Sequence, residues 1–187
     1  TGYAAATYLR GIDFIQIPTT LLAQVDSSIG GKTGVDFDQY KNMVGAFHHP
    51  RLVYMNTSSL KTLSEEQFAC GMGEVLKTGL IRDEKFYIWT INHMEPIMER
   101  VPAVLTKMIQ KCCDIKRIVV ENDPKEQGER AVLNLGHTVG HAIEKLKDFQ
   151  LAHGQCVALG TVAAAYISFQ RGYLSTEEFY EIRDMNV

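Results

Sequence analysis

The sequence lacks any pattern of paired cysteines. Its four cysteines, Cys70, Cys112, Cys113 and Cys156, show no CxxC spacing. A zinc-thiolate site or a disulfide framework normally requires regularly spaced cysteines. We therefore expect buried free thiols in a reducing cytoplasm.

An excess of positive charge and a long apolar run are also missing. The net charge is -3, which argues against a nucleic-acid-binding protein. No apolar stretch reaches the roughly 18 residues that a membrane-spanning helix needs. The opening TGYAAATYLRG lacks the basic n-region of a signal peptide. We expect a cytoplasmic protein with neither nucleic acid nor membrane as a partner.

The composition is otherwise globular, because 45% of the 187 residues are hydrophobic and can bury a core. Both ends of the sequence fall within a helical pattern. The first residue is not Met, and the final STEEFYEIRDMNV opens like a helix capped at Ser175 or Thr176 and then stops. We expect a fragment of a longer protein.

The first third of the chain mixes strand and helix patterns. The expected elements are a helix over 1–9 that ends at Gly11, a strand over 14–18, a helix over 19–29 and a strand over 51–56. Between them, GGKTGVD and KNMVGAF suggest a hairpin or paired loops, with Asn42 and Gly45 as turn residues.

From about Ser58 the apolar residues recur at helical spacing. Ser64 followed by glutamates is typical of a helix start, and Pro96 and Pro102 suit helix starts or breaks. Further helices are expected over 83–119, 131–149 and 151–172, with a polar loop over 121–130. The fold class predicted is α/β plus all-α, with an α/β part over 1–57 and a helical part over 58–187.

The run QVDSSIGGKTGVD, residues 24–36, contains the GGKT of a phosphate loop. A nucleotide-hydrolase loop, GxxxxGK[ST], needs glycine where this chain has Asp26. A carboxylate there would repel phosphate, and no strong strand leads into the run. The pattern therefore argues against a nucleotide hydrolase.

Histidines and a glutamate suggest a metal site. His137 and His141 lie one helical turn apart, which is common where two imidazoles bind one zinc ion. His153 begins the next expected helix, and Glu74 lies on a glycine-flanked helix in GMGEVLK. One glutamate and two or three histidines could form an open zinc site; the alternative is two surface histidines and an ordinary exposed glutamate.

Several cations stand close to Gly, Asn or Asp in polar stretches. They are Lys32, Lys41, Lys77, Lys116 and Arg130. Lys77 follows Glu74 by one turn, so both can face one cleft. Lys32 follows two glycines whose backbone can approach a phosphate. A group of fixed cations indicates an anionic substrate with phosphate or carboxylate groups.

In combination these motifs resemble one family. RGIDFIQIPTTLLAQVDSSIGGKTGVD, KNMVGAF, GMGEVLKTGLI, NLGHTVGHAIE and HGQCVALG occur in the order and with the spacing of 3-dehydroquinate synthase, over essentially the whole chain. The resemblance implies an N-terminal α/β domain that binds NAD, a helical domain that binds Zn2+ (or Co2+), and a homodimer. The implied reaction converts 3-deoxy-D-arabino-heptulosonate 7-phosphate, a phosphorylated sugar acid, into 3-dehydroquinate and phosphate.

The same resemblance implies roles for individual residues. The metal ligands would be Glu74, His137 and His153, which leaves His141 near the substrate phosphate. The phosphate pocket would be formed by Arg10, Lys32, Asn42 and Lys77, with Arg10 reaching a neighbouring subunit's site. The carboxylate would be held by Lys116 and Arg130, and the ring hydroxyls by Asp26 and Asn134, with Glu126 nearby. NAD would be lined by Thr19, Thr20, Leu22, Asp26, Lys41, Thr62 and Leu63.

Three departures from the family pattern matter. The glycine-rich turn for the NAD pyrophosphate would precede Thr1, and a late carboxylate-binding lysine would follow Val187. The family HGE is HGQ here, so Gln155 replaces a carboxylate that would act through hydrogen bonds around the metal. We expect the 187-residue chain alone to bind NAD poorly and to be inactive.

Other interpretations remain open from the sequence. Another sugar-phosphate cyclase, such as a 2-deoxy-scyllo-inosose synthase, would share the metal site and NAD but not the substrate carboxylate. A metal-dependent alcohol or glycerol dehydrogenase has a similar two-domain plan. A third possibility is a metal-binding helical or dimerising module without catalysis.

Overall fold

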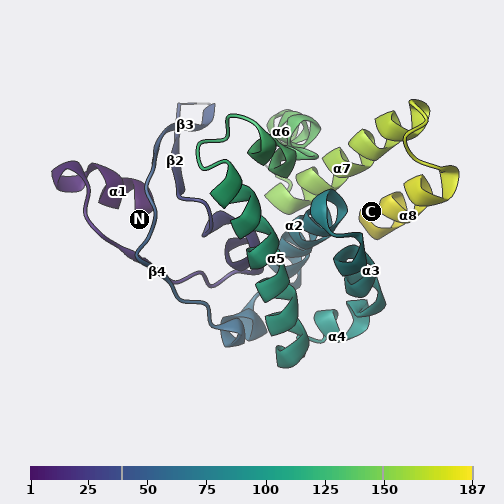
Figure 1. The fold of residues 1–187 in the computed structure, drawn as a ribbon, viewed down its shortest axis with the longest axis horizontal. Helices are drawn as coiled ribbons and strands as arrows, with labels where there is room; N and C mark the ends of the chain where they lie inside the picture. The colour runs from purple at the N-terminus through teal and green to yellow at the C-terminus, as the bar shows by residue number, and fades with distance from the viewer. Residues whose placement is uncertain (39, 149, 187) are drawn as a thin grey trace.

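The structure is a computed structural model that describes residues 1–187 except positions 39, 149 and 187; the side chain of Lys41 also lies outside the described part. Figure 1 shows short strands on the N-terminal side and helices over the rest of the molecule. The strands are β1 (Ile15–Gln16), β2 (Lys32–Phe37), β3 (Tyr40–Phe47) and β4 (Leu52–Val53). The α-helices are α1 (Gly2–Thr7), α2 (Glu65–Arg82), α3 (Glu84–Asn92), α4 (Met94–Met98), α5 (Pro102–Asn122), α6 (His137–Leu146), α7 (His153–Gln170) and α8 (Thr176–Asn186). Shorter helical turns are η1 (Tyr8–Arg10), η2 (Ala23–Ser27), η3 (Thr57–Thr62) and η4 (Glu129–Asn134).

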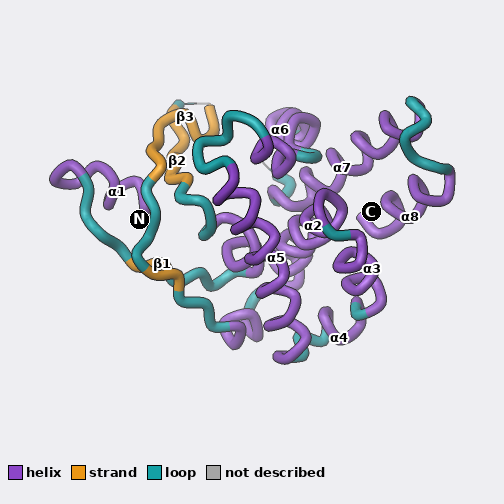
Figure 2. Tube along the Cα trace, in the orientation of Figure 1, coloured by secondary structure: helices purple, strands orange, loops and turns teal. Residues whose placement is uncertain are grey.

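The predicted order, a mixed α/β part followed by helices, is confirmed (Figure 2). In the described residues the strands form two small sheets: β1 pairs with β4 in parallel, and β2 pairs with β3 in antiparallel fashion. The strands β1 and β4 are shorter than the strands expected over 14–18 and 51–56. Pro18 and Pro50 flank the β1–β4 pair and cannot donate to its ladder, which limits its length.

The expected hairpin is present, but its turn lies elsewhere than predicted. The chain reverses between Phe37 and Tyr40, whereas Asn42 and Gly45 lie inside β3. Gly45 is opposite Gly34, and a Cβ on Gly45 would lie 2.7 Å from the carbonyl oxygen of Thr33. Gly45 therefore allows close strand pairing, and neither Asn42 nor Gly45 forms the turn.

The segment predicted as a helix over 19–29 is helical, with the wider turn of a π-helix in η2. Gln24 in η2 is fully buried, and its Nε2 donates to Pro18 O at 3.2 Å and to Asn56 O at 3.2 Å. It also reaches Ser59 Oγ at 3.3 Å. One buried amide thus ties η2 to the start of η3.

Most helix starts agree with their sequence signals. Ser64 Oγ accepts the amide of Gln67 at 3.4 Å before α2, and Pro102 is the first residue of α5. Ser175 caps α8, where its Oγ accepts the amide of Glu178 at 3.2 Å. The loop expected over 121–130 is shorter, because α5 ends at Asn122 and η4 begins at Glu129.

One helix begins later than predicted. The segment over 131–149 was expected to be a single helix, but residues 131–134 belong to η4, and α6 starts at His137. The break lies at Gly136, which has φ +79 and would clash through a Cβ with Thr161 Oγ1 at 2.6 Å. The left-handed glycine redirects the chain and makes His137 the first residue of α6.

The hydrophobic core joins both parts of the chain. Leu21 precedes η2 and Val25 lies in it. Both pack in one buried cluster with residues of α2, α3, α4 and α5, such as Phe68, Phe86 and Met108. This shared core holds η2 against the helices. In the described residues, no helix is both long and apolar enough to cross a bilayer.

The expectation of buried thiols is confirmed for three of the four cysteines. The four form no disulfide with one another, and Cys70, Cys112 and Cys156 are buried, while Cys113 is half-buried. Burial raises the pKa of Cys112 well above its ordinary value, so this thiol stays protonated and acts as a small apolar side chain.

Candidate functional site

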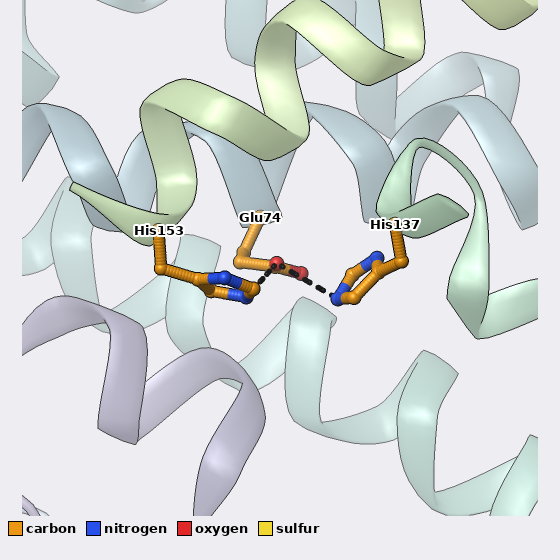
Figure 3. A group of neighbouring side chains, drawn as sticks. All are labelled: Glu74, His137 and His153. Atoms are coloured by element: carbon orange, nitrogen blue, oxygen red, sulfur yellow. Dashed lines mark ion pairs between the residues drawn. The ribbon is translucent and has the colours of Figure 1, made fainter. Parts of the chain in front are cut away.

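Three potential metal ligands converge from three helices (Figure 3). Glu74 lies in the middle of α2, and His137 and His153 are the first residues of α6 and α7. Glu74 Oε1 is 3.8 Å from His137 Nε2 and 3.7 Å from His153 Nε2. The three ligand atoms lie within 4.8 Å of one another. Two imidazole nitrogens and one carboxylate oxygen form a donor set suited to Zn2+ with an open coordination position.

The carboxylate of Glu74 is almost fully buried. Only 1% of the residue is exposed, and burial raises the pKa of this carboxyl against the opposing pull of Lys77. Oε2 forms an ion pair with Lys77, whereas Oε1 is buried without a hydrogen-bond donor. A buried oxygen without a donor is costly, and a cation between it and the two imidazoles would satisfy it. The residues therefore fit a metal ion.

His137 is oriented so that one ring nitrogen is available. Its Nδ1 lies 3.2 Å from the carbonyl oxygen of Leu135 and can donate to it. Burial and the nearby charge of Lys77 lower the pKa of His137 to about 4. The imidazole is therefore neutral near pH 7, with the lone pair of Nε2 directed toward Glu74, as metal binding requires.

The structure also brings His141 to this group. Its ring centroid is 5.3 Å from that of His137 and 5.9 Å from that of His153. A second set of possible ligand atoms comprises His141, Glu144 and His153. His137 and His141 thus do share a face, as their spacing predicts, but Glu74 approaches His137 together with His153.

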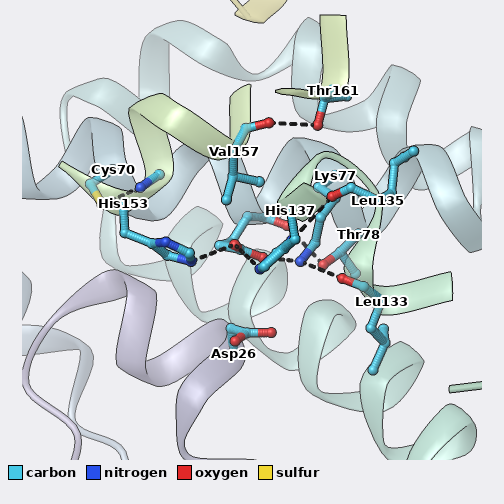
Figure 4. Close-up of polar contacts among 12 residues, drawn as sticks. Asp26, Cys70, Lys77, Thr78, Leu133, Leu135, His137, His153, Val157 and Thr161 are labelled. Atoms are coloured by element: carbon cyan, nitrogen blue, oxygen red, sulfur yellow. Dashed lines mark hydrogen bonds and ion pairs between the residues drawn. The ribbon is translucent and has the colours of Figure 1, made fainter. Parts of the chain in front are cut away.

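Glycines allow the three helices to approach closely. A Cβ on Gly73 would lie 2.8 Å from Gly154 O, and a Cβ on Gly154 would overlap the carbonyl oxygen of Cys70. The amide of Gly154 donates to Cys70 Sγ at 3.0 Å (Figure 4). Because Gly154 follows His153 directly, this contact between α2 and α7 sets the position of the His153 imidazole.

We expect Gly154→Ala to destabilise the protein by about 1–3 kcal/mol, because the added methyl group meets backbone that cannot move aside. Denaturant unfolding measures the loss. Gly128→Ala is the control, since the nearest atom to its Cβ is Asp123 Oδ2 at 3.9 Å. Equal stability of the two variants would contradict the close α2–α7 contact.

Gln155, which replaces the family glutamate, lies in the first turn of α7. Its Oε1 accepts the amide of Ala152 at 2.9 Å. An amide oxygen can make this hydrogen bond as well as a carboxylate can. The side chain therefore stabilises the start of the helix that carries His153.

A second ion pair links η2 to α5 beside this cluster. Lys116 Nζ donates to Asp26 Oδ1 at 2.7 Å and to Asp26 O at 2.6 Å. Burial would raise the pKa of Asp26, but Lys116, Lys77 and His137 outweigh it and lower the pKa to about 2. Asp26 is thus ionised over the whole neutral range. Figure 4 shows its carboxylate beneath Lys77 and His137.

Another polar chain joins β2 to the loop after α5. Lys32 forms an ion pair with Glu126, and Asn134 Nδ2 donates to Glu126 Oε1 at 2.8 Å. Burial would raise the pKa of Glu126, but the bonds from Lys32 and Asn134 lower it. Lys32 is thus brought next to Glu126 and Asn134, from which it is distant in sequence.

Arg130 is buried to an unusual degree for a charged residue, with 1% exposed. Its Nη1 donates to Pro124 O at 2.8 Å and its Nη2 to Gly30 O at 2.9 Å, while Nε has no partner. A Cβ on Gly30 would collide with this guanidinium. Arg130 thus fastens the GGKT segment to the loop after α5 and retains unused donors.

A cavity of about 500 Å³ lies on the N-terminal side, away from the three possible metal ligands. Among the predicted NAD-lining residues, Thr19 and Thr20 line it, and Lys32 borders it as well. Leu63 packs instead against the hydrophobic core, and Thr62 Oγ1 donates to Ser59 O at 3.4 Å. Ser59 Oγ in turn donates to Thr19 O at 3.2 Å. The segment that carries Thr62 therefore adjoins the segment that carries Thr19 and Thr20.

The remaining predicted residues lie elsewhere. Arg10 is exposed at the end of η1 with φ +70. Asn42 is exposed in β3, where its amide donates to Asp36 Oδ1 at 2.8 Å. Leu22 is half-buried beside η2, and a Cβ on Gly71 would lie 2.8 Å from its amide nitrogen. The side chain of Lys41 is outside the described residues.

Sequence reasoning missed Glu144. It lies seven positions after His137, on the stripe of α6 that also carries His141, and its Oε1 is 2.8 Å from His153 Nδ1. The i, i+4, i+7 spacing of two histidines and a glutamate is the signal that could have identified it.

Family models match the chain in two parts. A model described as 3-dehydroquinate synthase N-terminal matches residues 1–70, and one described as 3-dehydroquinate synthase C-terminal matches residues 71–186. Among curated relatives, 3-dehydroquinate synthase of Acetivibrio thermocellus is 55% identical over 164 residues, and that of Nitrosospira multiformis is 50% identical over 188 residues. These matches cover 88% and 100% of this chain but 46% and 51% of the relatives. The chain therefore spans about half the length of the curated relatives it matches.

Solved structures of sugar-phosphate cyclases share the fold. A 2-epi-5-epi-valiolone synthase from Streptomyces hygroscopicus subsp. jinggangensis, with NAD+ and Zn2+ bound, superposes with a TM-score of 0.93 at 27% identity, over 98% of this chain and 52% of that one. A 2-deoxy-scyllo-inosose synthase complexed with carbaglucose-6-phosphate, NAD+ and Co2+ gives 0.85 at 28% identity, over 99% and 51%.

Proposed function

Because the chain belongs to the 3-dehydroquinate synthase family, we propose that the protein converts 3-deoxy-D-arabino-heptulosonate 7-phosphate into 3-dehydroquinate and phosphate, a lyase reaction of the shikimate pathway and aromatic amino acid biosynthesis. The observation that carries the proposal is the convergence of Glu74, His137 and His153 beside Lys77 and Asp26. In a chain about 50% identical to enzymes of this name, that group of residues is the expected centre of the site.

Glu74, His137 and His153 would hold Zn2+, with Co2+ as an alternative. Both histidines point an Nε2 toward the buried carboxylate, and Glu74 Oε1 has no hydrogen-bond donor. When bound, the ion would act as a Lewis acid toward a substrate hydroxyl. The neighbouring carboxylate of Asp26, with its pKa near 2, can accept hydrogen bonds from ring hydroxyls throughout the neutral pH range.

NAD, which would supply a reversible oxidation of the substrate ring, is assigned to the N-terminal side. The 500 Å³ cavity there is of the size that small-molecule sites have, and Thr19 and Thr20 offer hydroxyl groups in it. Lys41, Leu22, Thr62 and Leu63 complete the proposed lining. We assign residues 1–57 to an α/β cofactor domain and residues 58–187 to the helical metal- and substrate-binding domain.

The substrate would be held at the junction of these two parts. Lys32, Lys77, Asn42 and His141 are proposed for the phosphate, with Arg10 contributed from a neighbouring subunit of a homodimer. Lys116 and Arg130 are proposed for the carboxylate, and Asn134, near Glu126, for a ring hydroxyl. The buried Arg130 Nε, which has no partner, is a donor that a substrate carboxylate could satisfy.

Three lysines of this region each form an ion pair with a carboxylate. Lys77 pairs with Glu74, Lys116 with Asp26, and Lys32 with Glu126. These pairs keep the ammonium groups in place around the site, so that little reorganisation is needed when an anionic substrate binds. A cytoplasmic location accompanies the proposed biosynthetic role.

A second candidate, another sugar-phosphate cyclase activity, is favoured only by the shared fold of the solved cyclases. Their identities of 27% and 28% are well below the 50% and 55% of the curated 3-dehydroquinate synthases. Lys116 and Arg130 also supply cations for a substrate carboxylate, which 2-deoxy-scyllo-inosose synthase substrates lack.

Phosphate release tests the proposal. We expect the chain extended to the length of its relatives to release phosphate from the heptulosonate phosphate with NAD and Zn2+, and to leave glucose 6-phosphate intact. The 187-residue chain is expected to show little turnover under the same conditions. Release from glucose 6-phosphate alone would transfer the assignment to the second candidate, and release from neither substrate by the extended chain would refute the proposed activity.

A further inference from the structure

The imidazole of His153 lies between two buried carboxylates. Its Nδ1 is 2.8 Å from Glu144 Oε1, and its Nε2 is 3.7 Å from Glu74 Oε1. The side chain of Glu144 is 3% exposed, and that of Glu74 is 1% exposed. A charged side chain is rarely buried this far without specific partners, and His153 is one partner of Glu144.

Close packing of α6 on α7 brings Glu144 to His153. A Cβ on Gly140 would lie 2.8 Å from Cys156 O, and one on Gly160 would overlap Gly136 O. The two helix backbones therefore touch, and Glu144, one turn after Gly140, lies on the face that contacts α7. Its carboxylate then reaches the first residue of α7.

The hydrogen bond to Glu144 decides which nitrogen of His153 carries the proton. A neutral imidazole donates through one nitrogen and accepts through the other. With Nδ1–H donated to Glu144, the lone pair of Nε2 faces Glu74. His137 is arranged in the same way, with Leu135 O as the acceptor for Nδ1. Both imidazoles thus present Nε2 to the same space.

This arrangement also selects between two overlapping sets of possible ligands. His153 belongs both to the set with Glu74 and His137 and to the set with His141 and Glu144. Donation of Nδ1–H to Glu144 leaves no lone pair on that nitrogen for a cation between the two side chains. The buried hydrogen bond therefore favours the set that contains Glu74.

We propose that Glu144 is a positioning residue for the metal site: it holds His153 in the Nδ1–H form and turns its Nε2 toward Glu74 and His137. The inference rests on the proposed metal site. A carboxylate in this place also makes the imidazole a stronger ligand, and loss of such partners typically weakens metal binding by 10–100-fold.

Competition with a chromophoric chelator measures the effect, using Zn2+ and the chain extended to the length of its relatives. We expect Glu144→Ala to lower the zinc affinity by about 10–100-fold. Glu144→Gln should recover most of the loss, because its amide oxygen can still accept the Nδ1 proton. The d–d absorption of bound Co2+ should change in Glu144→Ala and resemble the unsubstituted protein in Glu144→Gln.

Thr161→Val is the matched control. Thr161 is also buried at 2% exposure on α7, and its hydroxyl donates to Val157 O at 2.9 Å. We expect this variant to lose stability and to keep its zinc affinity and Co2+ spectrum. Unchanged affinity in Glu144→Ala, or equal losses in all three variants that follow their melting temperatures, would overturn the inference alone. An unsubstituted protein that binds no zinc would overturn the metal site itself, and this inference with it.

Discussion

Replacing Glu74 by glutamine is expected to abolish tight zinc binding and to lower the rate of phosphate release by about a thousandfold or more. Lewis-acid stabilisation of a transition state is worth several kcal/mol, and each 1.36 kcal/mol corresponds to a factor of ten. A loss of about 4 kcal/mol therefore gives about a thousandfold. Glutamine keeps the shape of the side chain but lacks the anionic oxygen that faces His137 and His153.

Metal content by elemental analysis and phosphate release, both on the chain extended to the length of its relatives, measure the effect. Glu66→Gln is the matched control, since Glu66 lies in the first turn of the same helix and is exposed. Removal of the metal with a chelator should reproduce the loss in the unsubstituted protein, and added Zn2+ should restore it. A Glu74→Gln variant that keeps one zinc ion and its activity would exclude Glu74 as a ligand.

Replacing Lys77 by methionine should destabilise the metal-free protein by about 3–5 kcal/mol, the usual cost of leaving a buried charge unpaired. The residue is 2% exposed, pairs with Glu74 and donates to Leu133 O at 2.9 Å. Thermal or denaturant unfolding measures the loss. With Zn2+ present the loss should be smaller, because the carboxylate of Glu74 then has another cationic partner.

The double variant Glu74→Gln with Lys77→Met should be more stable than Lys77→Met alone, since it removes the unpaired carboxylate. Lys61→Met, at an exposed position, should change the stability little. A loss below about 1 kcal/mol for Lys77→Met, the range of exposed ion pairs, would show that the pair does not behave as a buried one.

Helix starts were the most predictable part of the fold because their signals are local. Ser64 and Ser175 accept amide protons from their own first turns, and Pro102 needs no hydrogen bond at the first position of α5. The predictions failed at glycines whose role depends on contacts with segments distant in sequence. Gly45 was assigned to a turn and lies in a strand pair, and Gly136 interrupts what was expected to be one helix.

In the site, too, local features were predictable and contacts between separate helices were not. The spacing of His137 and His141 correctly places both on one face of α6, yet it cannot reveal which other helices approach that face. Glu74 and His153 reach His137 only because glycine contacts, such as Gly154 against Cys70, bring α2 and α7 together. Motif resemblance to the family, not spacing, assigned His153 as the partner of His137.

Residue order alone was thus enough to establish the family, the division into an α/β part and a helical part, and the types of residue available for catalysis. Motifs, caps and periodicity express short-range physics, and they can be read within a few helical turns. The tertiary structure alone decided that Glu144 holds Nδ1 of His153, that Arg130 binds the carbonyl of Gly30, and that Glu126 joins Lys32 to Asn134. These contacts depend on how closely separate elements pack, which is determined by the shared core and by glycines whose neighbours are distant in sequence.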